Sequence, residues 1–388
     1  MNRKSNSYLW LLPALLAGSL LFLLSSCQTT PKALPVFNPA KVDSVRMVLS
    51  DIATGCRYVP LSNEIPIRMI NRVVATDSLY FIGSPQNEIL VFNAEGKFQH
   101  KIGRLGNGPG EYHFSSAFTV DLEKKIVYLL DQNRLLEYNF EGQFLQETPL
   151  QKWGNDFQEI RYRDHLIYLF EPLSFGYAKY DWLILNEKGE AVGQKMNAIP
   201  QVQSQMGGNC YAFGDGNHLY YTNAVNDTVF SMEGKEWKAR CLFKLSNDKA
   251  TQNPGAGFNL LDIVSSGPDW FLRYFFDGKF YLAAFNIRSG KFQMVGQTSN
   301  LSSRDGGPGL ADDLDCGLPF VPKFRFTKDG NEWLCGYRYS YEVRNYVTSK
   351  SFQEAAAKYP EKKKQLQAFA DSLGENDNPV LMLVKLKE

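Results

Sequence analysis

The side chain with the most specific predicted chemistry is the thiol of Cys27. Basic Arg3 and Lys4 precede an apolar run over residues 9–24, and two serines separate that run from the cysteine. This order is the pattern of a bacterial lipoprotein signal peptide. We therefore expect residues 1–26 to be removed and diacylglycerol to be attached to the Cys27 thiol. The alternative is an uncleaved membrane anchor with an incidental cysteine, which the shortness of the apolar run disfavours.

The residues after Cys27 predict where the lipid would hold the protein. Gln28 follows the cysteine directly, and an Asp at this position would resemble an inner-membrane retention signal. No acidic cluster follows Gln28 either. We expect an outer membrane lipoprotein on the periplasmic side, with the cell surface as the second choice. Three prolines within residues 27–44 predict an extended tether between the lipid and the folded domain. The membrane is then contacted through the lipid anchor only.

Few other residue types carry a catalytic or metal-binding pattern. No G-x-S-x-G nucleophile motif and no CxxC pair occurs in the chain. The histidines have no metal-ligand spacing, so packed or solvated side chains are favoured and no cofactor is expected. An odd number of cysteines follows Cys27, which permits one or two disulfides, although buried free thiols are favoured. The residues concerned are His100, His113, His165 and His218, and Cys56, Cys210, Cys241, Cys316 and Cys335.

A stretch of aspartates could bind Ca²⁺ through its carboxylate oxygens. It comprises Asp305, Asp312, Asp313 and Asp315. The stretch lacks the regular spacing and the terminal glutamate of an EF-hand loop. A plain solvated loop without metal is therefore the favoured interpretation.

The elements that must position these side chains are indicated by a repeated phrase. Phe-Asn-Ala-Glu-Gly-Lys-Phe at residues 92–98 recurs in related form at about 45- to 55-residue intervals, at residues 138–144, 185–190, 230–235 and 285–292. Each copy reads as a strand end, a tight turn with glycine at positive φ, and a returning strand. A period of this length built from strands and turns is typical of a β-propeller with one four-stranded blade per period.

The repeat predicts an all-β protein with one six-bladed β-propeller over residues 45–388. The residues near 351–373 change to a helical period, interrupted at Pro360, and predict a short helical insertion in the last blade. Seven blades are the alternative, because the longest repeat interval and the long final unit could hold another sheet. An open ring would expose two sheet edges. We therefore expect a strand from residues 46–60 to pair with the last blade.

A glycine-rich segment at residues 102–112 lies between the first and second units. Its four glycines and the Pro109-Gly110 pair suit tight turns, and without a Walker Lys-Ser/Thr ending a phosphate site is disfavoured. Arg104, Glu111 and Tyr112 could reach the mouth of the central channel and bind a ligand. The favoured alternative is that Arg104 and Glu111 stabilise the turn itself.

This segment also carries a family resemblance, together with residues 226–230, 312–317 and 378–381. On these motifs most of residues 45–388 resembles the six-bladed, NHL/TolB-like β-propeller lipoproteins of Gram-negative bacteria, which are mostly domains of unknown function. The resemblance implies six blades, a lipid anchor and no established catalytic set. Asp315-Cys316-Gly317 departs from the Asp-Gly-Gly expected there, so a shared role of that loop does not follow.

The charge balance limits the partners. The chain has 42 basic and 41 acidic residues and no visible basic stripe, so nucleic acid is not expected. We expect a non-catalytic binding or scaffold module for an unknown envelope protein, peptide or glycan. The alternative is a periplasmic enzyme, a lyase or hydrolase, with acids and arginines at the channel mouth. A deep pocket with converging ionisable groups would favour the enzyme, and a shallow mouth ringed by exposed Tyr, Trp and Arg would favour recognition.

Overall fold

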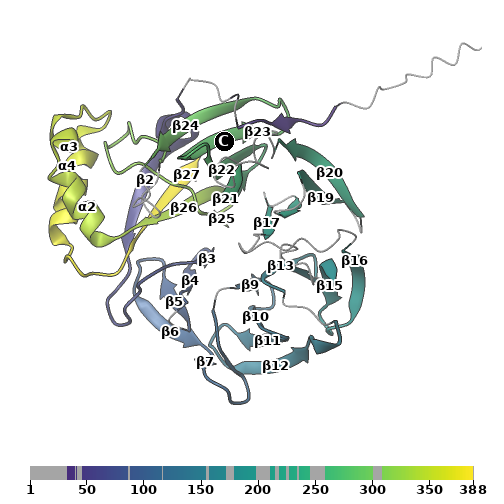
Figure 1. The fold of residues 1–388 in the computed structure, drawn as a ribbon. Helices are drawn as coiled ribbons and strands as arrows, with labels where there is room; N and C mark the ends of the chain where they lie inside the picture. The colour runs from purple at the N-terminus through teal and green to yellow at the C-terminus, as the bar shows by residue number, and fades with distance from the viewer. Residues whose placement is uncertain are drawn as a thin grey trace, which may run out of the picture. The chain divides into compact units, whose positions relative to one another are not determined.

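Six four-stranded sheets surround a central axis in the computed structural model (Figure 1). Among the described residues this is the predicted six-bladed β-propeller, and the seven-bladed alternative is not observed. The structure describes residues 33–39, 41, 46–85, 88–115, 117–153, 157–171, 179–197, 210–214, 218–223, 227–233, 236–244, 258–299 and 308–387. The predicted signal peptide, Cys27, Asp305 and part of the fourth phrase copy lie outside these ranges.

Each blade is an antiparallel sheet in which successive strands lie farther from the axis. The innermost strands contact one another around the ring. Blade one contains β3 (Arg72–Ala75), β4 (Leu79–Gly83), β5 (Ile89–Asn93) and β6 (Phe98–Ile102); blade two contains β9 (Ala117–Asp121), β10 (Ile126–Asp131), β11 (Arg134–Asn139) and β12 (Phe144–Pro149); blade three contains β13 (Glu159–Arg163), β14 (Leu166–Phe170), β15 (Tyr180–Asn186) and β16 (Ala191–Met196). Blade four contains β17 (Cys210–Gly214), β18 (Leu219–Asn223), β19 (Thr228–Glu233) and β20 (Glu236–Phe243); blade five contains β21 (Asn259–Ser266), β22 (Asp269–Phe276), β23 (Lys279–Asn286) and β24 (Phe292–Thr298); blade six contains β25 (Phe324–Lys328), β26 (Asn331–Arg338), β27 (Val380–Leu386) and β2 (Ala53–Pro60). Two short helical elements, α1 (Leu49–Ile52) and η1 (Gln151–Trp153), precede β2 of blade six and β13 of blade three.

The ring closes as predicted, through a strand from residues 46–60. Strand β2 pairs antiparallel with β27, with Tyr58 opposite Met382, and becomes the outermost strand of blade six. The two ends of the propeller are thereby held in one sheet. Apolar side chains fill the spaces between successive blades; one such core combines Phe81 and Val91 of blade one with Phe118 of blade two.

The helical insertion also lies where the sequence predicts it, between β26 and β27. It comprises α2 (Ser340–Val347), α3 (Lys350–Glu354) and α4 (Pro360–Ser372), beside blade six in Figure 1. Helix α2 was not predicted, and Pro360 begins α4 at the first helical position, which proline favours, instead of interrupting one helix. Buried Val343, Phe352 and Leu366 attach the insertion to the body.

Part of the predicted tether belongs to the folded unit, which begins at Leu34. Strand β1 (Val36–Phe37) adds to blade four as a fifth strand, parallel to β20. Within the part of the chain that is described, no helix is long and apolar enough to cross a membrane.

The repeated phrase forms the turn between the third and fourth strands of a blade. In blade one, Asn93 Oδ1 accepts hydrogen bonds from the backbone N–H groups of Glu95 and Lys97, and Gly96 has a φ of 80°. Asn139 and Asn186 bond the backbone in the same way in blades two and three. The asparagine, which the sequence interpretation left unused, is thus a turn-forming residue.

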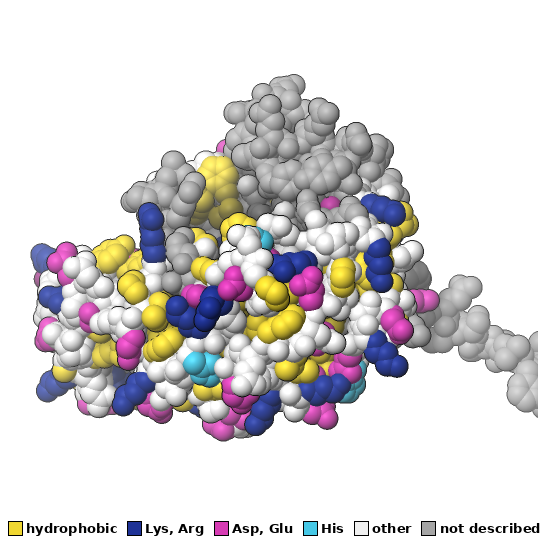
Figure 2. All heavy atoms as spheres, turned by 90° about the horizontal axis from the view of Figure 1, so that it is seen from below, with side chains coloured by type: hydrophobic (Ala, Val, Ile, Leu, Met, Phe, Trp, Pro, Cys, Tyr) yellow, Lys and Arg dark blue, Asp and Glu magenta, His cyan; other side chains and the backbone are white. Residues whose placement is uncertain are grey.

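The surface shows mixed charge on the side seen in Figure 2. Lysine and arginine side chains alternate there with aspartate and glutamate, and apolar side chains lie between them. No large area of one sign is visible on this side. A single-sign field that could attract nucleic acid is therefore not a feature of this side.

Candidate functional site: the central cavity

A cavity of about 700 Å³ lies inside the ring, and all six innermost strands contribute to its wall. This volume falls in the range of about 300–1,000 Å³ that is usual for ligand pockets. The described lining includes five basic and two acidic side chains. They are Arg72, Arg161, Arg163, Lys323 and Arg325, and Glu159 and Asp262.

The best-defined polar cluster in this cavity joins blades one and three. Both terminal nitrogens of Arg72 donate to Glu159 Oε1, over 2.9 and 2.8 Å. Arg161 Nη1 donates to the same oxygen. The Arg72 guanidinium lies 6.0 Å from the ring centre of Phe118 in blade two, and Arg161 donates to the backbone oxygen of Ala212 in blade four. The cluster thus connects four blades along the cavity wall.

Burial sets the protonation of the groups around this cluster. It raises the pKa of the Glu159 carboxyl, and the Arg72 guanidinium opposes that rise. Burial and the nearby Glu159 carboxylate also raise the pKa of the Cys210 thiol well above its ordinary value. A thiol with a raised pKa stays protonated at neutral pH, so Cys210 is not an activated nucleophile.

The remaining charges of the wall are held by neighbours on the same blades. Asp262 pairs with Arg273 over 3.2 Å, and Arg325 pairs with Glu332. The Lys323 ammonium lies 4.3 Å from the ring centre of Tyr337. Arg163 also pairs with Asp164, over 3.0 Å. The excess positive charge of the wall therefore rests mainly on Arg72 and Arg161, which share the single carboxylate of Glu159.

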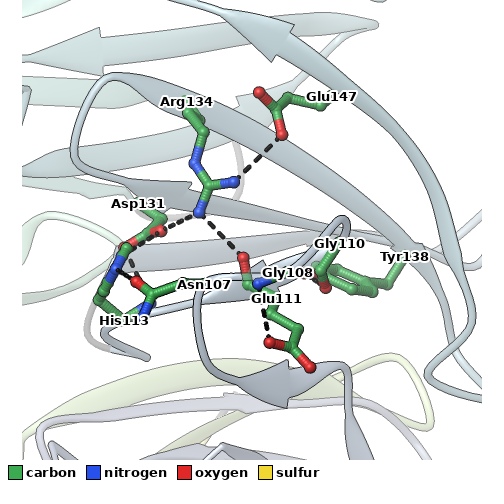
Figure 3. A network of polar contacts seen from close by, with 9 residues as sticks. All are labelled: Asn107, Gly108, Gly110, Glu111, His113, Asp131, Arg134, Tyr138 and Glu147. Carbon is green, nitrogen blue, oxygen red and sulfur yellow. Dashed lines mark hydrogen bonds and ion pairs between the residues drawn. The ribbon is translucent and has the colours of Figure 1, made fainter.

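The residues predicted as ligand-binding candidates lie elsewhere, in the glycine-rich loop of Figure 3. Arg104 is exposed in β7 (Arg104–Leu105), which pairs in parallel with β8 (Glu111–Tyr112). Glu111 Oε2 accepts the Gly108 N–H over 2.8 Å, so this carboxylate holds the turn, as the favoured alternative predicts. The structure brings the three candidates together but none of them lines the central cavity. A ligand role for them stays a prediction.

Two further groups hold this loop. Arg134 donates to the backbone oxygen of Glu111 over 2.9 Å and to Asp131 over 2.6 Å (Figure 3). Tyr112 is fully buried; its hydroxyl donates to Ile102 O over 2.7 Å and accepts from Ile89 N over 2.9 Å. The hydrogen bonds of the Tyr112 hydroxyl and the Glu111 carboxylate therefore explain these two residue types without a ligand.

The histidines of the chain contact ordinary hydrogen-bonding groups. His113 lies between Asp131, 3.0 Å away, and Asn107, 2.7 Å away. His100 contacts the backbone oxygen of Phe140 over 2.6 Å, and His218 lines the cavity. No group of three or more His, Cys, Asp or Glu side chains is placed to hold a metal in the ranges that the structure describes.

The predicted solvated aspartate loop is wrong for two of its members. Asp312 and Asp315 are buried, because Asp312 Oδ1 accepts the backbone N–H groups of Leu314 and Asp315 and turns the loop inward. Asp313 bonds Ser50 instead. Cys316, where the resemblance noted from the sequence implies glycine, takes a φ of 58°. That conformation is the reason glycine suits this position.

The cysteines agree with the favoured interpretation of free thiols. All five that follow Cys27 are unpaired in the described structure, and Cys241, Cys316 and Cys335 are buried. They pack as small apolar side chains.

Comparisons with known proteins identify the family but no activity. A search of curated proteins finds no match. A crystal structure of a Bacteroides fragilis protein named as exported has a TM-score of 0.63 and 15% identity, covering 92% of this chain and 100% of that one. The RRP9 WD40 repeats have a TM-score of 0.43 and 13% identity, covering 89% and 100%. A Thermus thermophilus protein named as an oxidoreductase (glucose dehydrogenase) has a TM-score of 0.41 and 13% identity, covering 85% and 100%. Residues 34–385 match the model described as Domain of unknown function (DUF4934), and the chain belongs to this family.

Proposed function

We propose that this protein is a non-catalytic binding module whose ligand, a segment of an envelope protein, peptide or glycan, enters the central cavity. The observation that carries the proposal is the central cavity. It is large enough for a ligand, and the two acidic side chains of its wall, Glu159 and Asp262, are already paired with arginines. A general base must be free to take a proton from its substrate. Glu159, with two guanidiniums on one oxygen, is poorly suited to that role.

A periplasmic enzyme remains the second candidate. Arg72, Glu159 and Arg161 converge in one cavity, and burial raises the pKa of Glu159. Convergent ionisable groups with shifted pKa values are typical of active sites. A lyase or hydrolase would use Glu159 as its acid and the arginines to stabilise developing negative charge.

The location of the protein is part of the same proposal. The lipoprotein pattern around Cys27 supports an outer membrane anchor, with the propeller on the periplasmic side or at the cell surface. The likeness to a protein named as exported is in keeping with this location. A lipid-held propeller would keep its cavity close to partners in the envelope.

A cavity-filling substitution tests the proposed function. Leu261 lines the cavity and is 36% exposed, so Leu261→Trp should fill part of it. Val192→Trp is the matched control, because Val192 is 47% exposed on the outermost strand β16. We expect pull-down from the native envelope and a glycan array to yield a ligand that the Leu261 variant loses and the Val192 variant retains. Turnover in a substrate screen with no captured partner would contradict a binding module.

A further inference from the structure

We infer that the central cavity binds an anionic ligand, a carboxylate-rich peptide segment; this inference rests on the proposed function. Its first support is the charge of the wall. Arg163 and Arg325 are paired with Asp164 and Glu332, whereas Arg72 and Arg161 share one carboxylate and leave an excess of positive charge. A concave, low-dielectric surface with an excess of one sign of charge concentrates ligands of the opposite sign, so the cavity favours an anion.

The second support is the geometry of the Arg72–Glu159–Arg161 cluster. One carboxylate oxygen accepts hydrogen bonds from both arginines, so two guanidinium charges share a single carboxylate charge. Each guanidinium has five donors in a planar fork that matches a carboxylate. The backbone oxygens of Ile160 and Ala212 accept further hydrogen bonds from Arg161. An incoming carboxylate would balance the remaining positive charge and use the Arg161 donors that Glu159 and these oxygens leave.

The third support is the partial burial of this cluster. The side chains of Arg72 and Glu159 are only 13% and 17% exposed, and Arg161 is 28% exposed. Charge-assisted hydrogen bonds are stronger in such a partly buried site than at an open surface. A ligand carboxylate reaching Arg161 from the cavity would therefore be held more tightly than on the outer rim.

A peptide fits the wall better than a sugar. Sugar recognition favours open aromatic faces. Of the cavity-lining rings, Phe118, Phe213 and Phe326 are buried and Tyr162 stacks on Tyr128, which leaves the half-buried Tyr211 and Phe324. The innermost strands, in contrast, are sheet edges that face the cavity. Sheet edges offer backbone N–H and C=O groups to an extended peptide. The arginines would then bind the acidic side chains of this peptide.

Titration with defined probes tests this inference. Fluorescence anisotropy would compare a labelled hexaglutamate peptide, its hexaglutamine counterpart and a galacturonate oligomer with the full-length protein. We expect hexaglutamate to bind at least about tenfold more tightly than hexaglutamine at low salt, with the affinity falling as salt is raised. Tighter binding of the galacturonate would overturn the peptide in favour of a glycan.

Two cavity variants should change this affinity in opposite directions. Arg161→Gln removes a cation, so hexaglutamate should bind about tenfold more weakly, whereas Glu159→Gln removes the competing carboxylate and should tighten binding about tenfold. Lys364→Gln, on the exposed surface of α4, should change nothing. A merely structural cluster would weaken binding in both cavity variants, so that result would overturn the inference. Thermal melts would show whether each variant folds.

The inference and the proposed function can fail separately. If the wild-type protein binds no acidic peptide but captures an uncharged envelope ligand that Leu261→Trp abolishes, the binding module stands and the anionic ligand is wrong. If acidic peptides bind and are also cleaved, the anionic specificity stands and the non-catalytic function is wrong.

Discussion

Asp312 and Asp315 place two neighbouring carboxyl groups beside the strand that closes the ring. Both residues are buried, and neither Asp312 Oδ2 nor Asp315 Oδ1 has a hydrogen-bond partner in the described structure. Burial first, and then the Asp315 carboxyl, raise the pKa of Asp312 to about 8. Tyr58 and Cys56 of β2 face the pair, as does Tyr346 of α2. No cationic partner compensates a second negative charge among these groups.

This pair should make the stability of the protein fall as pH rises. Between an unfolded pKa near 4 and the folded pKa of about 8, the native state holds a proton that the unfolded state has lost. The free energy of unfolding should therefore decrease through this window, by at most about 1.4 kcal/mol per pH unit for one proton. Asp312→Asn should flatten the dependence. Urea unfolding at pH 5 to 9 measures it, and equal slopes in both proteins would contradict a raised pKa of Asp312.

The failure of the sequence prediction at this pair has a plain cause. Aspartates in a loop are normally solvated, and the sequence shows no sign that Tyr58, more than 250 positions away, will cover Asp312. The departure at Cys316 was visible, but its meaning required the measured φ. Residue types predicted an acidic loop; only the fold could bury it.

At the scale of elements, the repeated turn does more than reverse the chain. A Cβ on Gly142 would lie 2.3 Å from the backbone oxygen of Lys101, on the outermost strand of the preceding blade. A Cβ on Gly96 would likewise meet the backbone oxygen of Pro60, and one on Gly189 would meet the side chain of Thr148. In these three copies the turn therefore packs closely against the preceding blade as well as needing a positive φ, whereas Gly290 of the fifth copy has only an ordinary contact with Pro35.

Two alanine substitutions separate these two requirements. Gly278→Ala meets open space at a φ of 76°, so it should cost only the backbone strain, about 1–2 kcal/mol. Gly142→Ala adds a clash with backbone at a φ of 85° and should cost at least about 2 kcal/mol more. Chemical denaturation measures both free energies of unfolding. Equal losses would show that the contact between blades does not matter.

Strand β1 is an element that could not be predicted from the sequence. Two residues show no periodicity, yet Phe37 is fully buried and contacts Phe243 of blade four and Tyr274 and Phe285 of blade five. Backbone bonds from Leu242 and Lys244 fix the segment on β20. The predicted tether is therefore attached to the propeller along part of its length.

A substitution at Phe37 should release this segment. Phe37→Ala removes a large buried ring and leaves a cavity between the blades, a change that costs about 3–5 kcal/mol in a core. Lys41 is already exposed, but undocking should free the backbone around it to enter a protease site, so trypsin should cleave there at least about tenfold faster. Val36→Ala is the matched control, because Val36 is 45% exposed on the same strand. Unchanged cleavage in the Phe37 variant would show that the ring does not hold the segment.

At the scale of the whole molecule, the sequence predicted the ring well and the site poorly. The number of blades follows from the repeat, which can be found in the sequence alone. Closure by residues 46–60 follows from the general cost of exposed sheet edges. The Arg72–Glu159 contact joins residues 87 positions apart and from different blades. Nothing in the repeat indicates which charged positions of the innermost strands face the axis. The glycine-rich loop was more conspicuous, but the hydrogen bond of its Glu111 carboxylate is made to the loop's own backbone.

Attachment to a membrane is the remaining property of the whole molecule that the sequence predicts. We expect Cys27→Ala to move the protein from the membrane fraction to the soluble fraction, because the thiol that would carry the acyl chains is gone. Gln28→Ala keeps the thiol and should stay with the membrane. Fractionation and mass spectrometry of the N-terminus measure the outcome. Retention of the Cys27 variant in the membrane would refute a lipid anchor and favour an uncleaved apolar segment.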